Sequence, residues 1–337
     1  MSRTFSDSLQ EVLAGRALET DRARRALGFV IDGGATAAQA GAFVAGLALR
    51  GVTCDEIVGF AQAVRERSLK AKPSRAPLLE TCGTGSAVAF NISTTVAFIA
   101  AGAGVAVAKQ VSRAVLGRCG SADVLDALGV RVDLPPESAA RCVDEAGIGF
   151  FLSSRFHPAL QSVASLRQDL GARTFFDLVE PLANPAGARL QLLGVYSTAL
   201  VPVLARALKA LGSDSAVVVS SRDGLDEFSL AAPSVVARLR GERIEEYEVD
   251  AAALGLLRRQ ATETAGGDAA ANAKILLAIL KGERSAAFEV ALLNAAAALI
   301  VAGKAADFKE GLAMATESVD SCRALGALEG VKKASLA

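Results

Sequence analysis

The alternation of short apolar segments with helical patterns after residue 75 constrains the fold more than any other feature of this chain. Buried strands are expected at residues 78–82, 105–109, 148–154, 190–197 and 215–221, with helical stretches between them. Strands joined in this way form a parallel sheet covered by helices on both faces. The sequence therefore predicts an α/β fold with a mainly parallel central sheet for the larger part of the chain.

The first 74 residues show helical patterns and no strand. Thr36 is placed to cap one helix, and both Ser8–Glu11 and Thr53–Glu56 have the spacing of a capping box, which predicts helix starts there. The proline-containing residues 70–77 read as a linker. The total of 337 residues fits two domains, at about 100–200 residues each. We expect a small helical domain at residues 1–74 and a larger α/β domain at 75–337.

The charge balance bears on the partners of the protein. Lys plus Arg and Asp plus Glu each total 36, so the formal net charge is zero. Nucleic-acid binders usually carry a basic excess. The short basic clusters at residues 22–25 and 65–72 read as solvated helix faces. These features argue against nucleic acid as a partner.

The cysteines and the N-terminus indicate a compartment. None of the five cysteines is spaced as CxxC, and the chain has one histidine, so no Cys/His zinc site is expected. Scattered free thiols suit a reducing cytoplasm. The N-terminus lacks the apolar core of a signal peptide, and no apolar run reaches about 18 residues. We expect a soluble cytoplasmic protein with no membrane partner.

A glycine-containing turn and a helix start together predict a phosphate site. Gly83-Thr84-Gly85 follows the first strand, and Asn91-Ile92-Ser93-Thr94 leads into a helix that begins near Ser93. Glycines let the backbone approach a ligand closely, and helix N-termini attract anions. The two segments would hold a phosphate or pyrophosphate. The alternative is an ordinary strand-turn-helix corner with a Ser or Thr cap.

Charged residues follow two other strands. Lys109 ends the second strand, with Arg113 four residues on, and a lysine there points into the crevice where such sheets bind ligands. Asp226 and Glu227 follow the strand at 215–221 and are suited to hold Mg²⁺ through oxygen ligands. The alternative for Lys109 is a surface lysine that ends a strand. The alternative for Asp226 and Glu227 is a polar turn without a metal.

His157 and Arg167 are further candidates. His157 is the one histidine of the chain and precedes a proline, a position that is more often structural than catalytic. Arg167 lies on an expected helix, where it would bind a carboxylate with two hydrogen bonds or form an ordinary salt bridge.

These motifs occur in an order that resembles one family. The set GTG, FNIST, VAK, GSADVLDALGV, HPAL, LGARTFFDLVEPLANP, GVY and DGLDEFS, over roughly residues 5–260, is similar to that of the anthranilate phosphoribosyltransferases. The resemblance implies transfer of phosphoribosyl from phosphoribosyl pyrophosphate to anthranilate, with Mg²⁺, in tryptophan biosynthesis. It also implies a homodimer formed through the helical domain, with part of residues 158–190 packed on that domain.

The resemblance assigns a role to each candidate position. The residues expected to bind phosphoribosyl pyrophosphate are Gly83, Thr84, Gly85, Asn91, Ser93, Thr94, Lys109, Arg113 and Ser121. The acceptor-side residues are Gly83, Ser112, His157 and Arg167. The metal ligands are Ser93, Asp226 and Glu227.

Two segments depart from the family pattern. The family has GTGGDG, whereas here Ser86-Ala87-Val88-Ala89 follows GTG, so the loop is about two residues shorter and lacks Gly-Asp. The family's Lys-His-Gly-Asn-Arg is Lys109-Gln110-Val111-Ser112-Arg113, and the following Ser-Ser or Ser-Gly is Leu116-Gly117. Val111 does not adopt positive φ as cheaply as glycine. The predicted site is therefore partly preserved and locally remodelled.

Three functions fit the sequence. The first is phosphoribosyl transfer to anthranilate, in which binding and charge stabilisation drive the reaction without a strong base. The second is a remodelled paralogue with another aromatic acceptor. The third is a non-catalytic protein of the same fold, such as a nucleic-acid binder, against which the zero net charge argues.

Overall fold

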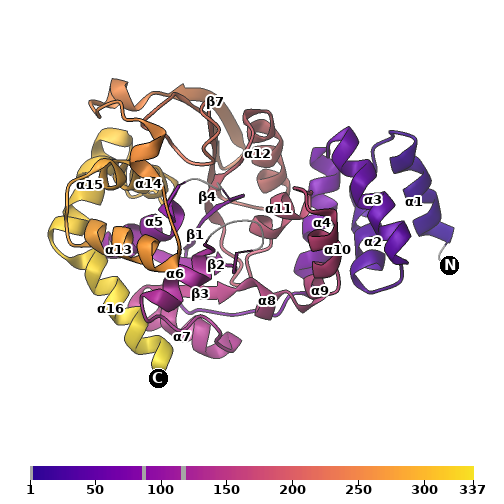
Figure 1. Ribbon diagram of the computed structural model, residues 1–337, viewed down its shortest axis with the longest axis horizontal. Coiled ribbons are helices and arrows are strands. Elements are labelled where there is room, and N and C mark those ends of the chain that lie inside the picture. The colour runs from indigo at the N-terminus through magenta and orange to yellow at the C-terminus, as the bar shows by residue number, and fades with distance from the viewer. Residues whose placement is uncertain (1–2, 86–88, 115–118) are drawn as a thin grey trace.

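In the computed structural model, a bundle of helices stands beside a larger α/β part, as Figure 1 shows. The structure describes residues 3–85, 89–114 and 119–337. The predicted fold class, a small helical region followed by an α/β region with a mostly parallel sheet, is confirmed. The N-terminal bundle consists of α1 (Arg3–Leu13), α2 (Thr20–Ile31), α3 (Ala37–Arg50) and α4 (Cys54–Arg67).

The sheet has seven strands in the order β3-β2-β1-β4-β5-β6-β7. The first five strands along the chain pair in parallel, whereas β6 and β7 form an antiparallel hairpin at one edge. The sequence analysis missed this hairpin. The strands are β1 (Leu78–Gly83), β2 (Ala106–Val111), β3 (Ile148–Leu152), β4 (Leu190–Gly194), β5 (Ser215–Ser221), β6 (Ser234–Arg240) and β7 (Arg243–Val249).

The sheet separates two hydrophobic cores. Successive strand residues point to opposite faces, so Leu192 and Leu193 of β4 belong to different cores. One core packs against α5 (Ile92–Gly102), α14 (Ala286–Val301) and α16 (Arg323–Leu336). The other packs against α12 (Val201–Ala210) and continues into the helical bundle. The bundle therefore shares its apolar core with one face of the sheet.

Two of the three predicted caps in the bundle are confirmed, and one is wrong. Thr36 and Thr53 cap α3 and α4, each in a capping box. Ser8, in contrast, lies inside α1, and its hydroxyl donates to the backbone oxygen of Thr4 over 3.0 Å. The reason is that Phe5, which precedes Ser8, is buried in the core, so the amphipathic pattern of α1 begins before Ser8.

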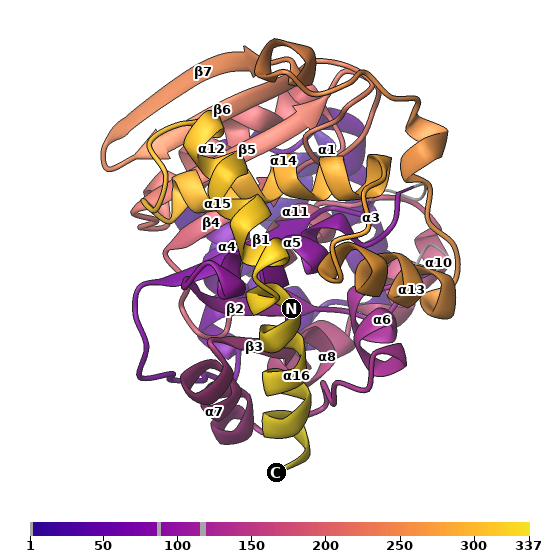
Figure 2. The same ribbon diagram turned by 90° about the vertical axis from the view of Figure 1, so that its left-hand side faces the viewer.

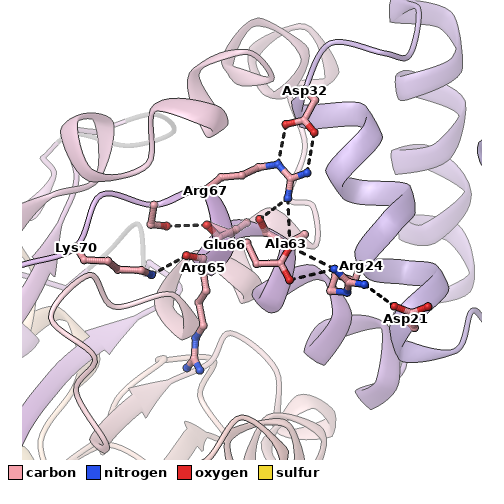
Figure 3. A network of polar contacts seen from close by, with 10 residues as sticks. Asp21, Arg24, Asp32, Ala63, Arg65, Glu66, Arg67 and Lys70 are labelled. Atoms are coloured by element: carbon pink, nitrogen blue, oxygen red, sulfur yellow. Dashed lines mark hydrogen bonds and ion pairs between the residues drawn. The ribbon is translucent and has the colours of Figure 1, made fainter.

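An ion-pair network joins α2 to the end of α4 (Figure 3). Arg67 donates to both carboxylate oxygens of Asp32 over 2.6 and 2.7 Å, and Arg24 contacts Glu66 over 3.1 Å. Arg24 also contacts Asp21 over 2.6 Å. The basic clusters of the sequence thus belong in part to helix–helix ion pairs.

Arg65 connects the bundle to the α/β part. Its Nε donates to the backbone oxygen of Leu182 over 2.8 Å, and its Nη1 donates to that of Leu211 over 3.1 Å. Burial lowers the pKa of Arg65. Since Leu211 is the C-cap of α12, this guanidinium lies at the negative end of that helix.

The remaining helices cover the sheet and its edges. Figure 2 shows α16 in front of the sheet, running toward the C-terminus. In the described part of the chain, no helix is long and apolar enough to span a membrane. The other helical elements are α6 (Ser121–Ala127), α7 (Pro136–Ala146), α8 (Ser153–Phe156), α9 (Pro158–Gln161), α10 (Ala164–Leu170), α11 (Phe176–Val179), α13 (Ala269–Leu280), α15 (Phe308–Asp320), η1 (Glu180–Leu182), η2 (Thr198–Leu200), η3 (Ala251–Leu254) and η4 (Ala261–Thr264).

Candidate active site

A cleft of about 320 Å³ opens at the carboxyl ends of the parallel strands. The chain runs from β1 to β2 and β3 on one side of the sheet and from β4 to β5 on the other, so the topology reverses between β1 and β4. Ligands of such sheets bind at this reversal. Of the predicted site residues, all but Thr94 and His157 line the cleft.

Two paired glycines let an acidic turn approach the ends of β1 and β4. Gly83 pairs with Gly194 in the sheet. A Cβ on Gly83 would lie 2.8 Å from Oδ2 of Asp226, and one on Gly194 would overlap the backbone of Asp226. The absence of side chains at these two positions brings Asp226 beside the Gly83-Thr84-Gly85 turn. The shortened segment after it, Ser86-Ala87-Val88, lies outside the described residues, as does Leu116-Gly117.

The helix expected near Ser93 begins one residue earlier. Asn91 is the N-cap of α5, and its side chain makes no capping bond. The amide of Ile92 donates to the backbone oxygen of Phe90 over 2.7 Å, and the amide of Ser93 bonds Glu227. The positive end of α5 nevertheless lies at the cleft, where it attracts anions. Thr94 is fully buried, and its hydroxyl has no hydrogen-bond partner among the described residues.

Lys109 lies inside β2 rather than at its end. Its side chain is 2% exposed, and its ammonium donates to the backbone oxygen of Thr81 and, over 3.1 Å, to Oγ of Ser93. Burial lowers the pKa of Lys109, and the carboxylates of Glu80 and Glu227 oppose this shift. The ammonium is thus a buried positive charge next to the start of α5.

Glu80, which the sequence analysis missed, does not line the cleft but contacts Gln110 and lies near Lys109, which do. It is fully buried, accepts a hydrogen bond from the backbone amide of Gln110 over 3.1 Å, and accepts another from the side chain of Asn184. Burial raises its pKa to about 7, against the effect of Lys109. A charged residue within the apolar segment Leu78-Leu79-Glu80 was the available signal.

Asp226 and Glu227 form the acidic part of the cleft and are almost fully buried. Burial raises the pKa of both carboxyls. The negative charge of Asp226 raises that of Glu227 further, while Lys109 opposes the shift. Oε2 of Glu227 has no hydrogen-bond partner among the described residues. Two buried carboxyls, one with an unpaired oxygen, fit Mg²⁺, which is commonly held by one or two carboxylates plus substrate phosphates.

The predicted acceptor-side residues occupy different environments. Arg167 lines the cleft and forms ion pairs with Asp177 over 2.9 Å and Glu180 over 3.2 Å. His157 lies behind Gln110, which it contacts through Nε2 over 3.0 Å, and its Nδ1 contacts Oγ of Ser68 over 2.6 Å. Burial lowers the pKa of His157 to about 4, so the imidazole is neutral at pH 7.

The segment that replaces the family's Lys-His-Gly-Asn-Arg begins as a regular strand, which ends at Val111. Val111 is the last residue of β2 and pairs with Leu152, so its backbone is extended and needs no positive φ. Ser112 and Arg113 are exposed in the cleft, and Arg113 contacts Asp123 over 3.2 Å and Asp126 over 2.8 Å. The strand is thus longer than the sequence predicted.

Arg173 and Asn272 also line the cleft, and the sequence analysis missed both. Arg173 donates to the backbone oxygens of Thr84 over 2.9 Å and Gly85 over 2.5 Å. Its guanidinium lies 4.8 Å from the ring centroid of Tyr196. Arg173 lies in the segment LGARTFFDLVEPLANP, to which the resemblance was traced, but no role was assigned to it. No local pattern in the sequence marks Asn272, because the fold brings it to the cleft from a distant position.

Comparisons with known proteins agree with this geometry. Residues 6–68 match the model of the glycosyl transferase family, helical bundle domain, and residues 75–325 match that of the glycosyl transferase family, a/b domain. The anthranilate phosphoribosyltransferase of Anaeromyxobacter dehalogenans is 48% identical over 316 residues, which cover 93% of this chain and 94% of that protein. The enzyme of that name from Rubrobacter xylanophilus is 45% identical, over 96% of this chain and 95% of that protein.

Solved structures give the same result. The crystal structure of anthranilate phosphoribosyltransferase from Thermus thermophilus superposes with a TM-score of 0.92 at 36% identity, over 98% of this chain and 100% of that chain. The Saccharomyces cerevisiae enzyme, in complex with PRPP and Mg, shares the fold with a TM-score of 0.90 at 23% identity, over 100% of this chain and 99% of that chain. The chain described here belongs to the anthranilate phosphoribosyltransferase family.

Proposed function

We propose that this protein transfers the phosphoribosyl group of phosphoribosyl pyrophosphate to the amine of anthranilate, with Mg²⁺, in tryptophan biosynthesis. The observation that carries the proposal is the meeting of a glycine turn, the N-terminus of α5, a buried lysine and two buried carboxyls in one cleft. Membership of the family, at 45–48% identity to enzymes of that name, supports it.

Phosphoribosyl pyrophosphate binds at the strand ends in this proposal. Gly83, Thr84 and Gly85 approach it through the backbone, and Asn91, Ser93 and Thr94 lie at the start of α5, whose positive end attracts anions. Thr94 takes part through its amide, since its hydroxyl is buried outside the cleft lining. The cationic and hydroxyl contacts come from Lys109, Arg113 and Ser121.

Ser93, Asp226 and Glu227 would hold Mg²⁺. The ion supplies charge neutralisation for the departing pyrophosphate. Lys109 contributes a second positive charge, which its contact with Ser93 places at the same point of the cleft. The partial exclusion of water around these groups strengthens their electrostatic effect on the reaction.

The acceptor binds on the side of Gly83, Ser112 and Arg167 in this proposal. Arg167 contacts the carboxylate of anthranilate, while Asp177 and Glu180 hold its guanidinium in place. His157 acts through Gln110, because it contacts this cleft residue from behind. The amine of an aromatic acid is already neutral at pH 7, so its attack on the ribose needs positioning and no strong base.

Further parts of the proposal concern assembly and compartment. We take residues 1–74, with part of 158–190, as the helical domain and 75–337 as the phosphoribosyl pyrophosphate-binding domain. The helical domain forms a homodimer, which the exposed Leu13 and Leu49 of α1 and α3 would support. Light scattering would test this.

A cytoplasmic location is supported by the free cysteines.

The test mixes the purified protein with Mg²⁺, phosphoribosyl pyrophosphate and anthranilate and follows the loss of anthranilate fluorescence. We expect turnover that chelation abolishes and that Asp226→Asn reduces. Absence of turnover by a folded protein contradicts the assignment. Binding of phosphoribosyl pyrophosphate would then indicate another acceptor, and salt-dependent retention on heparin would indicate a nucleic-acid binder.

A further inference from the structure

The segment before α13 packs on the chain that leads into α5. The backbone amide of Phe90 donates to Thr264 over 3.2 Å, and Ala89 forms a bridge with Ala265. A Cβ on Gly266 would lie 2.8 Å from Cα of Phe90, so the two backbones are in direct contact. This contact holds the start of α13 beside Asn91.

The side chain of Asn272 has its orientation fixed by a backbone donor. Asn272 is 3% exposed, and its Oδ1 accepts from the amide of Gly267 over 2.7 Å. A backbone N–H only donates, so the atom facing it is the oxygen. The Nδ2 group of Asn272 consequently faces Asn91.

The orientation of Asn91 follows from that of Asn272. Nδ2 of Asn272 donates to Oδ1 of Asn91 over 2.9 Å. Asn91 lines the cleft and is half-buried. Because its oxygen accepts from Asn272 and its own Nδ2 group donates to none of the described residues, this Nδ2 group is available to donate toward the ligand.

We propose that Asn272 is a positioning residue that makes Asn91 present hydrogen-bond donors, and not its carbonyl oxygen, to a phosphate group of phosphoribosyl pyrophosphate. The inference rests on the proposed function of the cleft. A donor facing a phosphate oxygen forms a charge-assisted bond, whereas a carbonyl oxygen in that place repels the ligand. Two hydrogen bonds in series, from the amide of Gly267 to Asn272 and from Asn272 to Asn91, fix this orientation.

Two substitutions of Asn272 separate this role from a purely structural one. Asn272→Asp keeps an acceptor for Gly267 but places a second acceptor against Asn91, which turns the Asn91 amide over. Asn272→Leu removes both bonds and leaves Asn91 without a fixed orientation. A structural role predicts that leucine is at least as harmful as aspartate, because it loses the Gly267 bond as well.

The experiment measures the Kd for phosphoribosyl pyrophosphate with Mg²⁺ by calorimetry, together with the KM for each substrate. For Asn272→Asp we expect the Kd to rise by about tenfold or more, the worth of one hydrogen bond to a charged group. The KM for anthranilate should change by less than about twofold, and Asn272→Leu should show a smaller rise in the Kd. Circular dichroism and thermal unfolding establish that each variant is folded.

A double-mutant cycle distinguishes the effect of the Asn91 orientation on the Kd from the direct effect of the negative charge that Asn272→Asp adds. In an Asn91→Ala background, Asn272→Asp should have almost no further effect on the Kd, because the two residues act as one unit. An equal rise in both backgrounds overturns the inference, as does an unchanged Kd for Asn272→Asp in a wild-type protein that binds the ligand. If Asn272→Asp does not fold, a Kd for Asn272→Leu equal to that of the wild type overturns it. Wild-type protein that does not bind phosphoribosyl pyrophosphate overturns the proposed function itself.

Discussion

Gly194 is the position where the smallest added side chain should have the largest effect on activity. It lies at the end of β4, paired with Gly83, and the backbone of Asp226 packs directly over it. The Gly194→Ala substitution adds a Cβ that overlaps the carbonyl oxygen of Asp226 and lies 2.7 Å from its carbonyl carbon. Real Cβ atoms essentially never come within 3.0 Å of another atom, so the turn that carries Asp226 and Glu227 must move.

The size of the effect follows from this displacement. Backbone cannot rotate away as a flexible side chain does, and we expect a shift of about 1 Å, which costs about 100-fold in rate at a positioning group. Overpacking should lower the free energy of unfolding by about 1–3 kcal/mol. The assay is kcat/KM from anthranilate fluorescence as a function of Mg²⁺, with urea denaturation for stability.

Gly326 provides the matched control, and Gly83 provides a comparison for the movement of the acidic turn. Gly83→Ala meets the side-chain oxygen of Asp226 at 2.8 Å, and since a carboxylate can rotate, the turn should move less than in Gly194→Ala. Gly326 lies in α16 with open space around it, so Gly326→Ala should leave activity unchanged. A kcat/KM for Gly194→Ala within about threefold of the wild type would refute the reasoning, since no 1 Å displacement would then have occurred.

Two further predictions concern the buried charges. Lys109→Met leaves the buried Glu80 and Glu227 without their positive neighbour. Urea denaturation should therefore show a free energy of unfolding that is lower by about 3–5 kcal/mol. A decrease of less than about 1 kcal/mol would contradict the pairing. His157 has its pKa lowered to about 4 by burial, with Glu180 raising it and Lys70 lowering it further. The unfolded chain therefore binds this proton first, and stability falls as the pH decreases from about 6.5 to 4, by up to about 3 kcal/mol. His157→Gln should flatten this part of the profile, and identical profiles would contradict the prediction.

The predictions that held depend on short-range rules. Thr36 and Thr53 cap their helices because a capping box closes within four residues and needs no other part of the chain. The apolar segments became parallel strands because their length and flanking helices leave few other arrangements. The same rule failed for Ser8, where the buried Phe5 extends α1 in front of the apparent cap.

The parts that were missed depend on how segments pair and pack. The hairpin of β6 and β7 escaped notice, although a Gly241-Glu242 turn joins its two strands. Lys109 was expected at a strand end, and pairing of β2 with β3 through Val111 places it inside the sheet instead. A single sequence does not state how far a strand pairing continues, because that depends on its neighbour.

The sequence by itself determined the helical and α/β parts of this chain, the caps of α3 and α4, and the residue types of the cleft. These follow from periodicity and from motifs whose members lie within a few residues of one another. Only the tertiary structure decided that the backbone of Asp226 packs against Gly194 and that the carboxylate of Glu80 lies near the ammonium of Lys109. It also decided that Asn272 donates to Asn91, which lies 181 residues away in the sequence. The physical reason is that hydrogen-bond direction and close packing are properties of pairs, and the fold alone chooses these pairs.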